Sequence, residues 1–272
     1  MVANSVLGLG KSGAKLAAKT GVTGQYVDLW NAGIAKAVSA LGEPGFPAVL
    51  ERALRHLVSF EMMNGFAYAA GGKAFDLDNE RIVGDRTTIV DHYLAGAYIL
   101  DPFYDAVRSA PRQGVLVMRQ LAPDRFTETE YYRRHYQATG IVDEIGFVLK
   151  LQHVDAVLSV SRIGAVPVFS RRDITRLESA APLVRALAER HWHARFQPQS
   201  GDVSAAATIS HPLLSKRELE IVTLILKGHS TYSIAATLGL SPNTVKVHRR
   251  QVYAKLTISS QAELFHLFLS RR

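Results

Sequence analysis

The 272-residue sequence contains no cysteine. Disulfide bonds, thiolate nucleophiles and cysteine-based zinc sites are therefore excluded, and a reducing compartment is compatible with the composition. Long apolar runs are also missing, because no stretch approaches the roughly 18 residues that a membrane-spanning helix needs. The N-terminus is basic and lacks the apolar core of a signal peptide. These absences predict a cytoplasmic protein with no membrane partner.

The N-terminal stretch has little patterning of its own. Its first 21 residues contain no acidic side chain, and we expect residues 1–43 to form a flexible or weakly helical leader. The segment GLGKSG at 8–13 resembles a phosphate-binding loop, but that loop needs a glycine where Ser5 stands and a strand before it. Only four residues precede Ser5, so we do not expect nucleotide binding, and the sequence predicts no cofactor.

Positive charge is concentrated at the C-terminus. The whole chain has a formal net charge of +8, and residues 213–272 hold nine Lys or Arg against three Glu. Within this region the stretch SPNTVKVHRRQVYAKL at 241–256 has no acidic residue at all. A basic module on a nearly neutral body indicates a polyanionic partner for that module alone.

Helix signals divide this basic region into four helices. Ser215 with Glu218 three residues later forms a capping-box pattern, and Gly228 ends that helix. Ser230 caps a second helix that Gly239 closes, and Ser241-Pro242 begins a third. A fourth follows at about 260–270. Two short helices joined by a glycine turn predict a helix-turn-helix.

The third helix presents two different faces at 100° per residue. Val245, Val252 and Leu256 lie on one side and are expected to face the core. The opposite side mixes an amide, cations and an apolar group, which suits hydrogen bonding to base edges and contact with a thymine methyl. Side chains on the flanks are expected to meet phosphates. The predicted DNA-binding residues are Asn243, Thr244, Lys246, Val247, Arg249, Arg250, Lys255 and Ser230.

The region resembles the LuxR-type helix-turn-helix of bacterial transcription regulators. The resemblance rests on about 60 residues, including Arg217-Glu218, Gly228-x-Ser230, Thr244-Val245-Lys246 and Lys255-Leu256. It implies that the third helix enters the major groove through Lys246, Val247 and Arg250, and that the fourth helix helps to pair two subunits. Thr231-Tyr232-Ser233 departs from the usual Asn-Lys-Glu. The implied partners are a double-stranded DNA operator and a second copy of the chain, with RNA polymerase a further candidate.

The rest of the chain is patterned as alternating helices and strands. Adjacent strands in hairpins favour an antiparallel sheet with helices on its faces, which is an α+β, PAS/GAF-like sensory arrangement. We predict this domain at 44–193, a polar linker at 194–212 and the all-α four-helix helix-turn-helix domain at 213–272. Helices are expected at 44–60, 86–108 (interrupted at Asp101-Pro102), 127–140 (capped by Thr127) and 170–192 (capped by Ser170), and strands within 65–77, 114–120, 145–152 and 155–163.

A sensory pocket is predicted between residues 93 and 136, which hold six of the ten tyrosines. Tyrosine combines an apolar ring with a polar tip, which suits a small-molecule pocket. The segment HYLAGAYILDPFY also resembles the Tyr…Asp-Pro stretch of acyl-homoserine-lactone domains, although Ile89 stands where those domains have a tryptophan. Each assignment has an alternative that stays open. The tyrosine rings would serve to fill the core instead of lining a pocket, and Asp101 would serve as a helix N-cap instead of a ligand contact. The candidate ligand-binding residues are Tyr93, Tyr98, Asp101, Tyr104, Tyr131 and Tyr132.

Other functions lack their residues. A phosphorylated receiver domain needs paired acids near its start, and residues before 60 do not supply them. The two histidines of His191-Trp192-His193 lie on different helix faces, which is poor metal geometry. We predict no metal and no enzymatic activity. The sequence thus predicts a DNA-binding transcription regulator controlled by a small-molecule effector, with a ligand-independent regulator, whose N-terminal domain dimerises or binds a protein, as the alternative.

Overall fold

The computed structural model describes residues 26–69, 72–80, 82–109, 114–196 and 209–269, and the chain divides into two compact units between Ser59 and Phe60. In the first unit, residues 26–39 form a helix and α2 spans Phe46–Arg55. These two helices meet at Gly33, where an added Cβ would lie only 2.9 Å from Ala53 Cβ. The helix predicted at 44–60 corresponds to α2, which is shorter than predicted at both ends. The first 25 residues of the predicted leader lie outside the described residues.

The second unit is built on a five-stranded antiparallel sheet. Its strands are β1 (Met62–Ala69), β2 (Ala74–Asp76), β3 (Val115–Val117), β4 (Ile141–Leu151) and β5 (Val154–Ile163), in the spatial order β2-β1-β5-β4-β3. β4 and β5 pair over their full length as a hairpin, and β1 pairs with β5 along all eight of its residues. The central strands are buried on both faces, so helices must cover both sides of the sheet.

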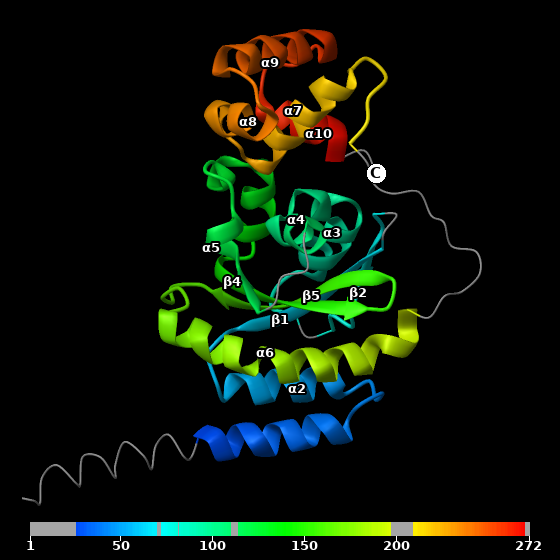
Figure 1. The fold of residues 1–272 in the computed structure, drawn as a ribbon, viewed down its shortest axis with the longest axis vertical. Coiled ribbons are helices and arrows are strands. Elements are labelled where there is room, and N and C mark those ends of the chain that lie inside the picture. Colours follow the sequence, from blue (N-terminus) through cyan, green and yellow to red (C-terminus); the bar gives the residue numbers. More distant parts are fainter. Residues whose placement is uncertain (1–25, 70–71, 81, 110–113, 197–208, 270–272) are drawn as a thin grey trace, which may run out of the picture. The chain divides into compact units, whose positions relative to one another are not determined.

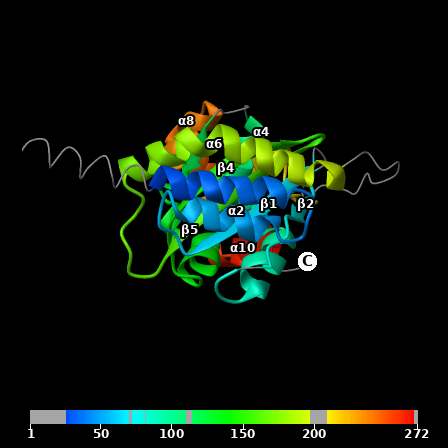
Figure 2. The same cartoon turned by 90° about the horizontal axis from the view of Figure 1, so that it is seen from below.

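One face of the sheet is covered by α6 (Arg171–Trp192), which crosses it as a single long helix (Figures 1 and 2). Ser170 Oγ accepts a hydrogen bond from the Asp173 amide, and the Asp173 carboxylate accepts one from the Ser170 amide. This capping box satisfies two amides at the helix start, which confirms the predicted cap. A short 3-10 turn, η5 (His193–Phe196), follows.

Short helical segments cover the opposite face (Figure 1). In chain order they are η1 (Thr87–Asp91), α3 (His92–Leu94), η2 (Ala97–Leu100), α4 (Pro102–Ser109), α5 (Met118–Leu121), η3 (Phe126–Glu128) and η4 (Tyr132–Gln137). The break at Asp101-Pro102 is where the sequence predicted it, because Asp101 adopts an extended conformation before the proline.

Two local predictions for this face are wrong. Thr127 does not cap the helix over 127–140, because it lies inside the 3-10 turn η3; Thr129 instead accepts the Tyr132 amide at 2.9 Å, through Oγ1. The strand predicted at 114–120 lasts only three residues, since Met118 already begins α5. In both places a tight turn replaced the regular element.

The C-terminal part consists of α7 (Lys216–Lys227), α8 (Thr231–Leu238), α9 (Pro242–Leu256) and α10 (Gln261–Leu269). All three predicted caps, Ser215, Ser230 and Ser241, accept a backbone hydrogen bond from the residue three positions on. The predicted fold class, an antiparallel-sheet domain followed by a helical domain, is confirmed. Among the described residues, no helix is long and apolar enough to cross a membrane.

Candidate functional site

The recognition face of α9 is exposed where the sequence predicts it. Asn243, Lys246, Val247 and Arg250 are all solvent-exposed, with Val247 at 44%. On the other side of the helix, Val245 and Val252 are completely buried and Leu256 is half-buried. The helix is thus anchored by its apolar side and presents an amide, two cations and a methyl-bearing side chain to the solvent.

The flanking residues are in more varied surroundings. Thr244 is half-buried and hydrogen-bonds Ser241 through the hydroxyls, 2.8 Å apart. The Arg249 guanidinium lies 5.2 Å above the Tyr253 ring. Lys255 Nζ contacts both Glu218 carboxylate oxygens, at 2.8 and 2.7 Å. Of these side chains, Lys255 is therefore held by an acidic partner within the domain.

Glu218 connects two parts of the helical domain. Its carboxylate accepts the Ser215 amide at 2.8 Å and binds Lys255 of α9, so it ties the start of α7 to the end of α9. The Lys255 ammonium and the Ser215 amide lower the Glu218 pKa to about 2. The capping-box prediction identified this residue, but its pairing with Lys255 depends on helix packing that the local pattern does not contain.

The turn between α7 and α8, residues 227–230, lies against the sheet-containing part of the same unit, residues 60–196, which the sequence predicts to be sensory and which we call the sensory part. Lys227 Nζ contacts both oxygens of Asp105 at 2.6 Å, the Arg125 amide donates to Gly228 O at 2.9 Å, and the Ser230 amide donates to Asp124 Oδ1 at 3.0 Å. The Ser230 contact lowers the Asp124 pKa. We call this turn the docked turn. One predicted DNA-contacting residue, Ser230, thus has its amide occupied by Asp124.

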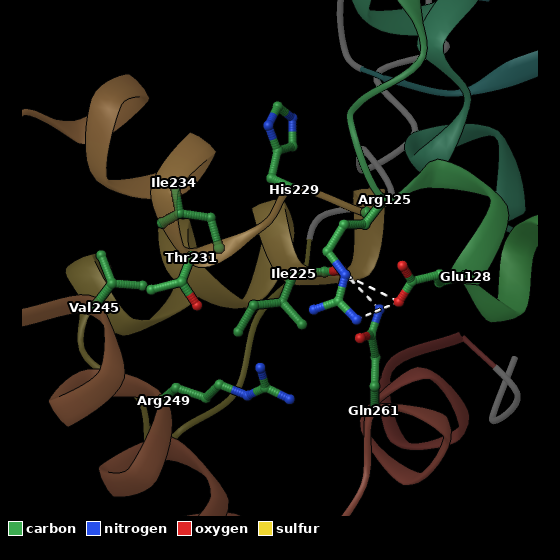
Figure 3. A pocket seen from close by; sticks show the side chains of 10 residues that line it. Arg125, Glu128, Ile225, His229, Thr231, Ile234, Val245, Arg249 and Gln261 are labelled. Atoms are coloured by element: carbon green, nitrogen blue, oxygen red, sulfur yellow. Dashed lines mark hydrogen bonds and ion pairs between the residues drawn. The ribbon is translucent and has the colours of Figure 1, made fainter. Parts of the chain in front are cut away.

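Figure 3 shows a small cavity beside the docked turn, with Arg249 and the Arg125–Glu128 ion pair around it. Its volume is about 10 Å³, which admits no more than one water molecule. It is therefore a packing gap between α9 and residues 125–128, and a ligand does not fit.

The predicted sensory residues meet in the core between β1 and the short helices. We call Tyr68, Tyr93, Tyr98, Tyr104 and Tyr131 the tyrosine cluster, and all five are buried. The Tyr68 and Tyr93 hydroxyls lie 2.6 Å apart, and Tyr93 donates to Asp101 Oδ2 at 2.7 Å. Tyr98 donates to the Gly72 carbonyl. Burial keeps the pKa of the Tyr68, Tyr93 and Tyr131 hydroxyls well above the usual range.

The rings of the cluster also pack on one another. Tyr104 meets Tyr68 edge-on with ring centroids 5.1 Å apart, and the His135 ring stacks between Tyr93 and Tyr131, 5.3 Å from each. The Tyr131 hydroxyl is buried near the Asp101 carboxylate but makes no well-aligned hydrogen bond. Tyr132 does not join the cluster, because it is half-buried and stacks on Tyr136 instead.

Two carboxylates are buried in this core. Asp101 accepts from Tyr93 and also from the Phe103 amide at 2.7 Å, so it both caps α4 and joins the cluster. Burial and the nearby Glu144 raise the Asp101 pKa to about 7. Glu144 accepts from Tyr136 at 2.7 Å, and burial raises its pKa too. Burial lowers the His135 pKa to about 4, which keeps that ring neutral. Neither carboxylate has a cationic partner among the described side chains.

Sequence reasoning missed Tyr68, His135 and Glu144 as members of this core. Tyr68 and Glu144 lie on β1 and β4, far in sequence from the tyrosine-rich stretch, and only the sheet pairing brings them to it. His135 lies within the tyrosine-rich stretch itself, and this position was a signal that could have placed it in the core.

The fold and the exposed face of α9 together define a helix-turn-helix DNA-binding protein. The family model "Bacterial regulatory proteins, luxR family" matches residues 212–268. A protein of Aeromonas salmonicida, described as an HTH-type transcriptional regulator in the exeN 3′ region, is 34% identical over 184 residues, which are 62% of this chain and 93% of that protein. The chain therefore belongs to the LuxR family of bacterial DNA-binding transcription regulators, whose members are not enzymes.

Two further comparisons each cover one part of the chain. The oxygen regulatory protein NreC of Staphylococcus epidermidis is 38% identical over 76 residues, or 28% of this chain and 34% of that protein. The LBD domain of VqsR from Pseudomonas aeruginosa has a TM-score of 0.53 and 22% sequence identity, covering 62% of this chain and 98% of that domain. The VqsR comparison shows that the sheet-containing part of this chain shares the fold of that domain.

Proposed function

We propose that this regulator reads its operator by placing α9 in the major groove. Asn243, Lys246, Val247 and Arg250 contact base edges, and Thr244, Arg249, Lys255 and Ser230 serve the phosphates. The observation that carries this proposal is the exposed, acid-free face of α9 on a helix anchored by Val245 and Val252. Lys255 and Ser230 must first exchange Glu218 and Asp124 for phosphate oxygens.

The groove assignment is tested with two variants and a charge-matched control. Lys246→Ala and Arg250→Ala should each weaken binding to a mapped operator by about tenfold to a hundredfold, since a good base contact contributes about 1–3 kcal/mol. Lys216→Ala removes the same charge from an exposed position at the start of α7 and should change affinity only slightly. Fluorescence anisotropy at several salt concentrations measures all three, and unchanged affinity in both α9 variants would refute the assignment.

We propose further that the sensory part binds a small molecule at the tyrosine cluster. The supporting observations are the Tyr131 hydroxyl, which makes no well-aligned hydrogen bond, and the two buried carboxylates without a cation. Such groups favour a ligand that offers hydrogen-bond donors, because an unpaired buried polar group is costly. Ring packing fills the space around Tyr93 and Tyr104, so the ligand has to displace a ring. That same packing favours the second candidate, a ligand-independent dimerisation or partner-binding domain.

A thermal-shift screen of the full chain separates these two candidates. Acyl-homoserine lactones and aromatic acids are the probes, and a concentration-dependent rise in Tm reports binding to the folded state. Tyr131→Phe should change the ligand-free Tm little, because it removes a hydroxyl that makes no well-aligned hydrogen bond, yet it should reduce the ligand-induced shift. A hit whose shift is equal in wild type and Tyr131→Phe would place the ligand elsewhere, and no hits would favour the ligand-independent alternative.

We propose a homodimer, because one recognition helix reads few base pairs and two-fold operators match two-fold proteins. RNA polymerase is a candidate partner, and the cytoplasm is where the operator would be met. We propose the domain division 44–193, 194–212 and 213–272, with most of the linker outside the described residues.

A further inference from the structure

A second and larger pocket lies between the sensory part and the docked turn. Its volume is about 200 Å³. The sensory part contributes a largely apolar wall that includes Leu100, Ala106 and Leu121, and the docked turn contributes Lys227 and His229. No member of the tyrosine cluster lines it. It is therefore a site separate from that cluster, although Leu100 and Pro102, on either side of Asp101, belong to its wall.

The size of the pocket restricts its occupant. A cavity of about 150 Å³ in an engineered protein holds benzene, so about 200 Å³ accommodates one ring with a small substituent. A long acyl chain needs more room. The buried side chains of Leu100 and Ala106 offer the apolar contact that such a ring requires.

The polar side of the pocket is an ion pair that can be exchanged. The Lys227 side chain is only 15% exposed, whereas that of Asp105 is 44% exposed. Two of the three ammonium protons are directed at the Asp105 oxygens. A largely buried ammonium must keep a negative partner, but a half-exposed carboxylate can turn to water at small cost. A ligand carboxylate can thus take the place of Asp105 without leaving Lys227 unpaired.

From this geometry we infer that the pocket between α4, α5 and the docked turn binds a small monocyclic carboxylate. The ring lies against Leu100, Ala106 and Leu121, and the carboxylate pairs with Lys227 in place of Asp105. Because the ligand touches both the sensory part and the helix-turn-helix, its binding is linked to their docking. The inference does not rest on ligand binding at the tyrosine cluster.

Benzoate is the probe, and isothermal titration calorimetry on the full chain is the measurement. Benzamide, a neutral molecule of similar shape, is the matched ligand control and should bind at least tenfold more weakly. Lys227→Gln should weaken benzoate binding at least tenfold. Asp105→Asn should strengthen it several-fold, because the competing carboxylate is gone. Ala106→Phe should abolish it by filling the pocket, with circular dichroism confirming that each variant is folded.

The variants also locate the site. Tyr98→Phe alters the tyrosine cluster and should leave benzoate affinity unchanged. Weaker binding in Asp105→Asn, or equal binding of benzoate and benzamide, would overturn the carboxylate exchange. Loss of benzoate binding in Tyr98→Phe but not in Ala106→Phe would place the ligand in the cluster. Operator binding by the same samples is measured in a separate experiment. The benzoate titrations therefore test the pocket even if the proposed DNA contacts of α9 are wrong.

Discussion

The Asp101 side chain connects the start of α4 with the tyrosine cluster. Its carboxylate caps α4 through the Phe103 amide and accepts the Tyr93 hydroxyl in the tyrosine cluster. The sequence left helix capping and ligand binding as alternatives for Asp101, and the structure shows the capping contact and, beside it, the contact with Tyr93. They coexist because the carboxylate has two oxygens and lies where the extended residue before Pro102 turns its side chain inward. A ligand that changes the Tyr93 contact therefore also acts on the start of α4.

Burial of Asp101 predicts an unusual dependence of stability on pH. Its pKa is raised from 3.8 to about 7, so between these values the folded protein keeps a proton that the unfolded chain has lost. This contribution to the free energy of unfolding is complete below about pH 4 and is lost as the pH rises to about 7. Asp101→Asn imitates the protonated form. Its free energy of unfolding relative to that of the wild type should therefore increase as the pH rises from about 4 to about 7.

Urea unfolding of both proteins at several pH values measures this difference. His135, whose pKa is lowered to about 4, contributes the opposite slope, since its neutral folded form favours unfolding in acid. Burial raises the Glu144 pKa in the same direction as that of Asp101. Both groups are present in both proteins, so the difference reports the titration of Asp101 together with its coupling to Glu144. A constant difference across pH 4–7 would show that Asp101 is ionised in the fold.

At the scale of elements, helix ends were predictable and tight turns were not. Ser170, Ser215, Ser230 and Ser241 all cap the helices that the sequence assigned to them, because a cap depends on residues within one turn of the chain. The helix that continues as η4 was predicted to be capped by Thr127, whereas Thr129 accepts the Tyr132 amide and Thr127 lies in the 3-10 turn η3. The exposed face of α9 could be predicted from the helical period of its sequence. The residues around Asp105 and Asp124, in contrast, gave no local signal of the contacts with Lys227 and Ser230.

The end of α7 provides a test of the docked turn. Gly228 has φ +94°, and a Cβ there would lie 2.7 Å from Thr129 Cγ2 and 2.8 Å from Phe126 Cα. Gly239 ends α8 at φ +63° with nothing within 4 Å. Both alanine variants should lose about 1 kcal/mol from the left-handed backbone, but Gly228→Ala should also push the helix-turn-helix away from the sensory part.

Differential scanning calorimetry and limited proteolysis distinguish these two effects. Gly239→Ala should lower Tm and leave one cooperative transition as in wild type. Gly228→Ala should separate the unfolding of the two parts and speed cleavage within 194–212. Identical behaviour of the two variants would mean that the contacts at residues 125–129 contribute nothing to docking.

At the scale of the whole molecule, the docked turn occupies some of the polar groups of the helix-turn-helix and leaves others exposed. The face of α9 that we propose to read bases is exposed, yet the Ser230 amide is bound by Asp124 and Lys227 by Asp105. The start of α8, the first helix of the helix-turn-helix, is where such a motif crosses the DNA backbone. If α9 and α8 contact DNA as proposed, docking opposes phosphate contacts without covering the bases, which would suit a regulator whose affinity is adjusted by the state of its sensory part.

Asp124→Ala tests this balance directly. The variant loses the bond between Asp124 Oδ1 and the Ser230 amide, so operator affinity should rise about threefold to tenfold, as expected when a hydrogen bond of about 1 kcal/mol no longer competes with phosphate. Removing any acidic residue also strengthens DNA binding through net charge. Glu178→Ala makes the same charge change at an exposed position on α6 and is the control. Since a general electrostatic effect would raise both affinities equally, only an excess in Asp124→Ala supports competition at α8. Equal gains, measured by fluorescence anisotropy at matched salt, would leave Asp124 as one surface charge among many and would assign control of DNA binding to another contact.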